Sequence, residues 1–563
     1  MAHWIYTVIL AIAGLLQCST GQSMQATFHM EGVAGQATMT WSAQTLTVTL
    51  NIQENLGQTT VEIHPIWVNY DAIDKCSDAV LGNTLDGATA QTTIVSGSPV
   101  SVSFSNVPSL TYYEGHSLVL RGNKVVCATI ERDGDHVTAR VRLRGSVFGD
   151  VYLRQPNDGG SSSTRIVSDL ATQSDAKMGD WRITDNFPTC DEFMNKVLNS
   201  FHDPTSSASS GCSTSNQNAC AIGDLTSKHG YINFTSSTDS SERAAYTDSN
   251  LPLYGDNSVR NLLMIVIPKN NKVKPACGKV NVYAERSAKA TFSNDGVTGT
   301  IEFRQKSPLD STITAVKLQG LAGVAGGYHV HMWPVPEREA SSQGNMCAPE
   351  RVSGHFNPFI AQVGSPGSPN YPAPEASTYD MYEVGDLSAK YGMLNGQQSM
   401  VNTYTDYNLQ LFGRNSIVGR SLVIHRNDAT SSRWVCVNIE PQYPVVAAQA
   451  LFLYPVIGRV MFMQERGRPE SDTSVFATLD YIDETPDTKD HKWMVGSTPL
   501  GDDMLEVDLK SRCVSAGSLY NPANLSPGLT NQVHASNKPV PFETGDLAGK
   551  LGLLSIGYSA ASQ

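Results

Sequence analysis

The sequence predicts an all-β protein made of tandem antiparallel β-sandwich or β-barrel modules. At 563 residues the chain is too long for one small domain and has room for about three to four. Its 46 Gly and 28 Pro residues, with 40% hydrophobic and 17% charged residues, are typical of strands joined by long turns rather than of helical bundles. A motif that recurs at a nearly constant interval indicates that the modules are repeats.

The recurring motif is Gly-Asp-Leu-x-x-Lys-x-Gly. It occupies Gly223–Gly230, Gly385–Gly392 and Gly545–Gly552, at intervals of about 160 residues. A second recurring pattern is an apolar run followed by a Lys or Arg that stands three residues before a Cys. This pattern also occurs in the first part of the chain. The motif and this pattern together divide the chain into four repeats, near 24–133, 134–285, 286–441 and 442–563.

Strand patterns fill these repeats. From Leu46 to Ile52 and from Val137 to Leu143, hydrophobic residues alternate with polar ones. This period of two is the pattern of a strand with one buried face. Helical periodicity is scarce, so we expect antiparallel β modules with long functional loops. Repeat 4 reaches its motif but no closing strand or second cysteine, and we expect it to be C-terminally incomplete.

The N-terminus carries an apolar run from Ile5 to Leu16, which is too short to cross a bilayer and ends in small or polar residues. We expect residues 1–22 to be a secretory signal peptide rather than a membrane anchor, and the mature protein to be secreted and extracellular. No later run is apolar enough to predict a membrane span. The net charge of -13, without any basic run, argues against nucleic acid as a partner.

Nine cysteines remain once Cys18 leaves with the signal peptide, and in an oxidising compartment they should pair. Since nine is odd, one cysteine is left over. The spacing predicts one long-range pair in each of the first three repeats and one local pair. The expected pairs are Cys76 with Cys127, Cys190 with Cys277, Cys347 with Cys436, and Cys212 with Cys220. Cys513 would remain unpaired and available for an intermolecular disulfide.

Repeat 3 holds four of the 13 histidines: His329, His331, His355 and His425. On a strand, residues i and i+2 point to the same side, so His329 and His331 can converge on one ion. An isolated His-x-His pair is usually a surface coincidence, but four histidines in one repeat favour a metal site. Imidazoles without a thiolate suit copper or zinc, and copper can perform one-electron chemistry.

With these residues, repeat 3 resembles a copper/zinc superoxide dismutase domain. The resemblance rests on the His329-Val330-His331 strand, the His355 loop, the Gly-Asp-Leu segment, His425 and the Arg433-x-x-Cys436 ending. It implies Greek-key β-sandwich or barrel domains. It also implies that the four histidines bind copper, that Arg433 steers and orients superoxide, and that His355 carries a proton.

Two departures from the family pattern concern zinc and the approach to the site. The sequence has no His between His355 and Asp386, and Glu383 stands where the family has a zinc-binding His. His425 and Arg433 are eight positions apart, far closer than the family's usual guiding loop allows. Both departures, and the tandem arrangement, are similar to the copper-only superoxide dismutase repeat proteins of animals. One copper ion is therefore expected, and zinc is not.

The roles expected of two carboxylates near the histidines differ. Glu383 is expected to accept a hydrogen bond from His355 in place of zinc. Asp386 has two open interpretations, because Asp224 and Asp546 occupy its position in repeats that lack the histidines. It either supports the metal site or bonds the loop backbone.

The other repeats have lost the ligand set. Aligned on the same landmarks, repeat 1 has Glu62, His64 and Arg121 at the positions of His329, His331 and His425. Repeats 2 and 4 also lack a complete set. Two functions follow: a secreted copper-only superoxide dismutase that converts superoxide to oxygen and hydrogen peroxide at one site, or a noncatalytic extracellular scaffold that binds copper, matrix or partners.

Overall fold

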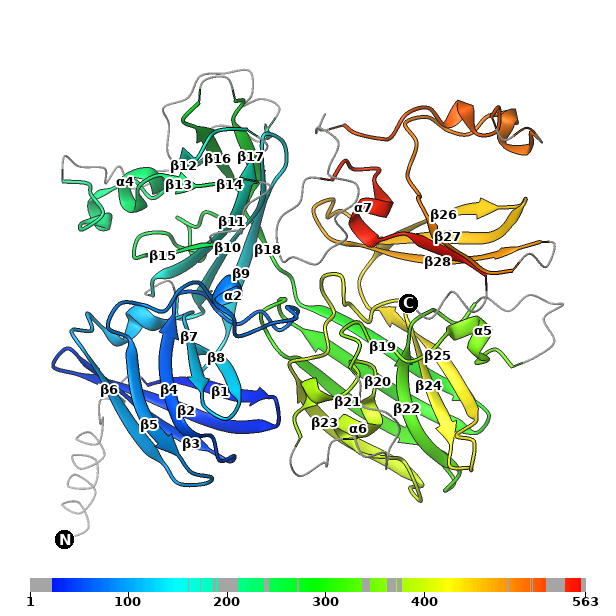
Figure 1. The fold of residues 1–563 in the computed structure, drawn as a ribbon, viewed down its shortest axis with the longest axis horizontal. Helices are drawn as coiled ribbons and strands as arrows, with labels where there is room; N and C mark the ends of the chain where they lie inside the picture. Colours follow the sequence, from blue (N-terminus) through cyan, green and yellow to red (C-terminus); the bar gives the residue numbers. More distant parts are fainter. Residues whose placement is uncertain are drawn as a thin grey trace, which may run out of the picture.

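Figure 1 shows a computed structural model in which strands form nearly all of the regular structure. The structure describes residues 23–557 except 160–161, 173, 186–188, 191–210, 237–242, 271–272, 337–344, 362–370, 372–376, 483–485, 507, 509 and 523–541. The predicted signal peptide, residues 1–22, lies outside the described residues. Among the described helices, none has the length and apolar character needed to cross a membrane. The all-β class predicted from the sequence is confirmed.

Repeats 1 and 3 share one strand order, to which repeat 1 adds β5 at the edge of its sheet. Repeat 1 comprises β1 (Met24–Met30), β2 (Val33–Ser42), β3 (Thr45–Ile52), β4 (Gly57–His64), β5 (Thr89–Ile94), β6 (Val100–Ser105), β7 (Ser117–Arg121) and β8 (Val125–Arg132), with the short α2 (Asp78–Leu81). Its sheet order is β5-β4-β7-β8-β1-β2-β3-β6. The last strand returns to lie beside the first, as in a Greek key.

Repeat 3 follows the same order with longer loops. Its strands are β19 (Arg286–Asn294), β20 (Val297–Gln305), β21 (Thr312–Gln319), β22 (Ala325–His331), β23 (Ser399–Asp406), β24 (Ser421–Arg426) and β25 (Arg433–Pro441), and its helices are α5 (Pro349–Val352) and α6 (Leu387–Tyr391). The sheet order is β22-β24-β25-β19-β20-β21-β23, and β25 again returns beside β19. Its core is a continuous cluster of buried aliphatic and aromatic side chains.

Repeat 2 is divided between two sheets. They contain β9 (His136–Leu143), β10 (Val147–Pro156), β11 (Thr164–Thr172), β12 (Met178–Thr184), β13 (Ile232–Asn233), β14 (Thr235–Ser236), β15 (Ala244–Asp248), β16 (Leu263–Pro268), β17 (Ala276–Lys279) and β18 (Asn281–Val282), with α4 (Leu225–His229). One sheet has the order β14-β11-β10-β9-β18, and the other has the order β13-β12-β16-β17. The two share one hydrophobic core around Trp181.

Repeat 4 has far fewer buried hydrophobic side chains than the other repeats among the described residues. It contains β26 (Val445–Phe452), β27 (Val456–Glu465), β28 (Thr473–Tyr481), β29 (Thr488–His491), α7 (Leu547–Leu551) and β30 (Leu554–Ile556). The first three strands form one sheet, and β29 pairs with β30. Among its described residues, the buried hydrophobic side chains are Val460, Phe476, Leu547 and Ile556.

A glycine with positive φ marks the second strand of every repeat. These are Gly35, Gly149, Gly299 and Gly458, with φ between 124° and 156°. A Cβ atom at any of them would lie within 2.0 to 2.4 Å of a backbone carbonyl oxygen on the next strand. Only glycine fits such a position, so the four residues are structurally equivalent and fix the register of each repeat.

The Gly-Asp-Leu-x-x-Lys-x-Gly motif forms a short capped helix in three repeats. In each, the Asp side chain accepts a hydrogen bond from the backbone N–H three residues later, so Asp224, Asp386 and Asp546 are N-caps. The motif's Lys turns back and donates to a backbone carbonyl; in repeat 3, Lys390 Nζ lies 2.8 Å from the oxygen of Val384. The recurrence of the motif is thus explained by structure that the repeats share.

Four disulfides join the cysteine pairs expected from the spacing. They are Cys76–Cys127, Cys190–Cys277, Cys212–Cys220 and Cys347–Cys436. Cys513 is free and exposed. Three of the four bridges tie a long loop to a strand near the end of a repeat, which restricts the loop in the folded and unfolded chain alike.

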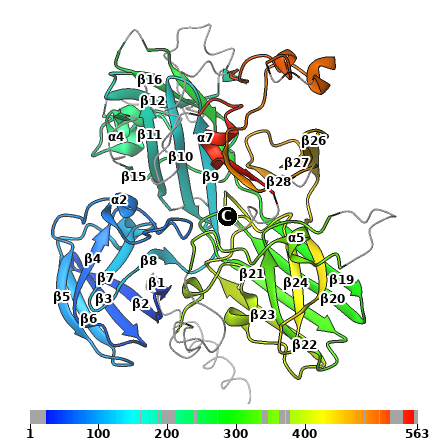
Figure 2. The ribbon, with the colours of Figure 1, turned by 45° about the vertical axis from the view of Figure 1, so that its right-hand side comes forward.

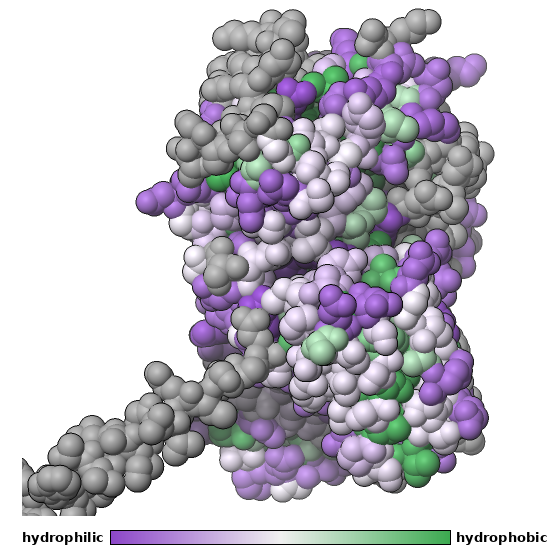
Figure 3. Space-filling view, turned by 90° about the vertical axis from the view of Figure 1, so that its left-hand side faces the viewer, coloured by the Kyte–Doolittle hydropathy of each residue, from purple (hydrophilic) through white to green (hydrophobic). Residues whose placement is uncertain are grey.

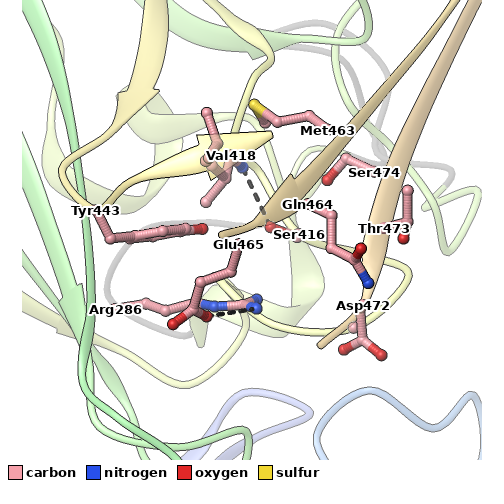
Figure 4. Close-up of a pocket in the computed structure, with 12 residues that line it drawn as sticks. Arg286, Ser416, Val418, Tyr443, Met463, Gln464, Glu465, Asp472, Thr473 and Ser474 are labelled. Carbon is pink, nitrogen blue, oxygen red and sulfur yellow. Dashed lines mark hydrogen bonds and ion pairs between the residues drawn. The ribbon is translucent and has the colours of Figure 1, made fainter. Parts of the chain in front are cut away.

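Figures 1 and 2 place the four repeats at the corners of a square, and charged residues join them where they meet. Asp472 of repeat 4 lies 3.6 Å from both Arg140 and Arg142 of repeat 2. Figure 4 shows the junction of repeats 3 and 4, where Arg286 Nη2 lies 3.5 Å from Glu465 Oε2 and the guanidinium stacks near Tyr443. Repeat 4 is therefore joined to repeats 2 and 3 by charged side chains.

Candidate metal centre

Strand pairing brings the four histidines of repeat 3 together. His329 and His331 alternate on β22 with the buried Val330, so both side chains point away from the core. β22 pairs with β24, where His331 lies opposite Ser421 and His329 opposite Val423, and this register leaves His425 near the end of the pair. His355 joins by an isolated bridge to His331.

The four rings surround one small volume. One ligand atom from each of His329, His331, His355 and His425 lies within 4.8 Å of the other three. The Nε2 atoms of His331 and His425 are 3.5 Å apart. Two adjacent nitrogens this close favour a shared cation over two protons. Among the described residues, this is the group of His, Cys, Asp or Glu side chains placed to hold a metal ion.

Backbone carbonyls fix the tautomers of two histidines. Nδ1 of His331 lies 2.9 Å from the carbonyl oxygen of Ser353, and Nδ1 of His425 lies 2.7 Å from that of Ser431. A carbonyl oxygen only accepts, so each Nδ1 donates a proton and each Nε2 keeps its lone pair. Both lone pairs are therefore available to a metal.

His355 and His329 are oriented by carboxylates. Nδ1 of His355 lies 2.7 Å from Oε2 of Glu383, which leaves Nε2 of His355 available to the cluster. Nε2 of His329 lies 3.4 Å from Oδ1 of Asp386. Nδ1 of His329 is buried and has no hydrogen-bond partner. A buried ring nitrogen without a partner is costly unless it binds an ion, so this atom is the direct sign of a ligand site.

Burial lowers the pKa values of three of the four histidines. Desolvation, and after it repulsion from His355, lower the pKa of His331 to about 2 and that of His425 to about 4. Burial and the same neighbours hold the pKa of His329 well below its usual value. Neutral imidazole is the form that binds metals, so at neutral pH protons offer little competition. Four imidazoles without a thiolate fit copper.

Arg433 borders the cluster and is held by backbone. Its Nη1 donates to the carbonyl oxygen of Cys347 at 3.0 Å, and its Nη2 donates to that of Ser353 at 2.7 Å. The Ser353 oxygen thus accepts from both Arg433 and His331. The Cys347–Cys436 disulfide joins the same loop to β25, on which Arg433 lies. The position of the guanidinium relative to the rings is therefore set by the loop.

Glu383 and Asp386 make different contacts in the structure. Glu383 contacts His355 directly, and its other oxygen accepts from Asn357 Nδ2 at 3.3 Å. Asp386 caps α6, and its Oδ1 lies 3.4 Å from Nε2 of His329, so its contacts are compatible with either interpretation. Sequence reasoning missed Ser353 and Ser431, because they act through backbone oxygens that no motif marks.

Repeat 1 replaces the metal site with ion pairs. Arg121 Nε lies 2.7 Å from Oε2 of Glu62, and Nε2 of His64 lies 3.2 Å from the same oxygen. Nδ1 of His64 lies 2.7 Å from the carbonyl oxygen of Gly82. A guanidinium therefore supplies the positive charge that an ion would bring in repeat 3.

Comparisons with known proteins point to the same repeat. The family model described as Copper/zinc superoxide dismutase (SODC) matches residues 297–439. A Cu-Zn superoxide dismutase 5 of Dictyostelium discoideum is 34% identical over 139 residues, which are 25% of this chain and 77% of that protein. A cell surface Cu-only superoxide dismutase 5 of Candida albicans is 35% identical over 152 residues, 26% of this chain and 56% of that protein.

A solved structure, Candida albicans superoxide dismutase 5 with Cu(II), is 29% identical and covers 28% of this chain and 92% of that chain, with a TM-score of 0.22. The matched segment of the chain contains all four clustered histidines and Arg433. The Dictyostelium relative matches over most of its own length. The chain therefore belongs to the copper/zinc superoxide dismutase family.

Proposed function

We propose that repeat 3 is a copper-only superoxide dismutase site that converts two superoxide anions and two protons to oxygen and hydrogen peroxide. The observation that carries this proposal is the cluster of four imidazoles in which buried Nδ1 of His329 has no protein partner. His329, His331, His355 and His425 would hold the ion. A bound copper ion would supply the one-electron oxidation and reduction.

The chain's own residues have three roles in this proposal. Arg433 attracts and orients the anion, since its guanidinium brings positive charge to the site of an acidic protein. Nε2 of His355 would carry a proton to the reduced substrate whenever it does not hold the ion, because Nδ1 of the same ring is engaged by Glu383. The carbonyl oxygens of Ser353 and Ser431 keep the rings of His331 and His425 in their orientation.

The absence of a zinc requirement is also a proposal. Glu383 stands where the family has a zinc-binding His, and its Oε2 lies 2.7 Å from Nδ1 of His355. We further propose four repeats near 24–133, 134–285, 286–441 and 442–563, with residues 1–22 as a signal peptide of a secreted protein. The four disulfides and the match to a cell surface relative support secretion.

The test is superoxide decay per bound copper ion in the full chain. His425→Ala should abolish both tight copper binding and decay above the level of free copper, whereas His491→Ala in repeat 4 should change neither. Tight binding of copper without turnover would refute the dismutase and leave the noncatalytic copper-binding scaffold.

A further inference from the structure

Repeat 1 lacks the metal ligands but makes a specific contact with repeat 3. The two repeats lie side by side in the lower half of the molecule in Figures 1 and 2. On the face seen in Figure 3, hydrophobic side chains form small patches separated by hydrophilic and neutral ones, as is normal for a protein surface. The contact with repeat 3 is more informative, because much of it is made with one loop.

That loop carries the metal-site residues His355 and Glu383 between β22 and β23. Of residues 355–386, which we call the His355 loop, the structure describes 355–361, 371 and 377–386. The regular element among these described residues is the 3-10 helix η4 (Tyr379–Met381). The 2.7 Å contact between Nδ1 of His355 and Oε2 of Glu383 therefore depends on what holds an irregular loop in place.

A hairpin turn of repeat 1 holds the second half of the His355 loop. Glu31 and Gly32 connect β1 with β2, and their φ angles are 53° and 73°. The N–H of Glu31 donates to Oδ2 of Asp380 at 3.0 Å, and the N–H of Gly32 donates to Oγ1 of Thr378 at 2.8 Å. Thr378 is 1% exposed, so the second of these bonds is shielded from water.

The equivalent turn of repeat 3 has the same conformation without this contact surface. Asp295 and Gly296 connect β19 with β20, with φ angles of 53° and 88°. Both of these residues are exposed, whereas Gly32 is buried. The turn is therefore common to the fold, and its burial against the His355 loop is particular to repeat 1.

Two side chains of repeat 1 contact the same loop. The ring of His29 lies edge-on to that of Tyr379, with 4.9 Å between the centroids. Nζ of Lys75 lies 4.9 Å from the centroid of the Phe359 ring. His29 and Lys75 lie outside the hydrophobic core of repeat 1, so their removal should leave that repeat folded.

Both contacted segments lead directly to the metal site. Phe359 lies in a turn that begins at Asn357, and Nδ2 of Asn357 donates to Oε1 of Glu383 at 3.3 Å. Tyr379 begins η4, which ends two residues before Glu383. A displacement of either segment would therefore move Glu383 relative to the ring of His355.

We propose that repeat 1 positions the copper ligand His355. Its Glu31–Gly32 turn, His29 and Lys75 hold the His355 loop, and Glu383 then stays against Nδ1 of His355 and keeps Nε2 directed into the cluster. This inference rests on the proposed copper site and gives a repeat without a ligand set a role in that site. These residues of repeat 1 are positioning residues, since they act through the loop.

The test alters repeat 1 in the full chain at its two side-chain contacts with the loop. In metal-free protein, His29→Ala with Lys75→Ala should speed hydrogen exchange of the 377–386 amides about tenfold, because an edge-to-face ring pair and a cation–π contact together are worth about that factor. Amides of β24 should keep their rate. Copper affinity, titrated against a chelator, should fall about tenfold. The electron paramagnetic resonance spectrum of bound Cu(II) should also change, because one ligand ring is held less firmly.

Two further variants show whether these effects belong to the contacts. His29→Phe with Lys75→Arg keeps a ring and a cation at the same positions, and it should restore the exchange rate, the copper affinity and the spectrum. Trp41→Ala removes a ring that is 40% exposed on repeat 1 and whose indole N–H donates to Val107 of the same repeat. This control should change none of the three.

Unchanged exchange in the double alanine variant would overturn the proposal. Faster exchange with unaltered copper affinity and spectrum would also overturn it, since the loop would then be held without effect on His355. The same changes in Trp41→Ala would overturn it as well, because they would reflect a general loss of stability. Absence of superoxide decay in the original chain would refute the dismutase alone, because exchange, affinity and spectrum are measured without superoxide.

Discussion

Nδ1 of His355 and Oε2 of Glu383 are 2.7 Å apart, on the side of the ring that faces away from the histidine cluster. The contact fixes the ring orientation and leaves Nε2 for the metal. Repeat 4 keeps the carboxylate without the histidine: Glu543 Oε1 accepts from Asn521 Nδ2 at 2.9 Å, as Glu383 accepts from Asn357. The Asn–Glu contact thus belongs to the fold, and the histidine contact is specific to repeat 3.

Glu383→Ala should weaken copper binding by about 10- to 100-fold, because the ring of His355 loses the partner that orients it. The Glu383→Gln variant should lose less copper affinity, since its amide oxygen can still accept a hydrogen bond from Nδ1 of His355. Copper titration against a competing chelator measures the change. The matched control is Glu543→Ala, which removes the equivalent carboxylate from repeat 4. An equal loss of affinity in the control would show that Glu383 acts only through the stability of the fold.

Arg433→Met should lower the rate of superoxide decay about tenfold and flatten its dependence on salt, because local positive charge accelerates the encounter with an anion. Copper content should stay close to one per chain, since a guanidinium is not a copper ligand and Arg433 donates to the backbone oxygens of Cys347 and Ser353. Arg304→Met, which removes an exposed arginine from β20, is the control for net charge. A rate that keeps its salt dependence in Arg433→Met would contradict the steering role.

The metal-free protein should lose stability as the pH falls from about 6.5 toward 4. The pKa of His425 is about 4 and that of His331 about 2 in the folded protein, so in this range the unfolded chain binds more protons than the folded one. Each such imidazole adds about 1.4 kcal/mol of destabilisation per pH unit. Hydrogen exchange of β24 amides against pH measures this slope. His425→Gln should reduce the slope, and an unchanged slope would contradict the assignment.

Much of the candidate site follows from sequence because it depends on short periods and spacings. His329 and His331 share one side of a strand by the period of two, and the cysteine spacings matched the four disulfides. The shared carbonyl oxygen of Ser353 was not predictable, since it depends on a backbone turn with φ of 61° after α5. Nor could the sequence show which nitrogen of His329 faces the cluster.

The motif that revealed the repeats was informative about architecture rather than chemistry. Its persistence in repeats without histidines already indicated a structural role, and the N-caps at Asp224, Asp386 and Asp546 explain it. The sequence could not show that the Lys of the motif in repeat 3 is buried against a carboxylate at the end of the next strand, β23. Lys390 and Asp406 are both fully buried, 3.1 Å apart, and their sequence positions give no sign of the pair.

Asp406→Asn should destabilise repeat 3 by about 3 to 5 kcal/mol, because it leaves the buried charge of Lys390 without its partner. Asp406 also accepts from the hydroxyl of Tyr391 at 2.9 Å, so the substitution loosens α6. Ser388 on α6 donates to the carbonyl oxygen of Tyr328, next to His329, and copper affinity should therefore fall as well. Hydrogen exchange of β23 amides in the full chain measures the loss locally.

The control removes both charges of this pair. Lys390→Met with Asp406→Leu replaces the ion pair by apolar side chains and should be closer to the original protein in stability than Asp406→Asn alone, since no unpaired buried charge remains. If the double variant were as unstable as the single one, the cost would lie in the lost hydrogen bonds of Asp406 rather than in the charge of Lys390. If copper affinity falls in the same order as the stability of β23 across these variants, helix α6 transmits the effect to His329.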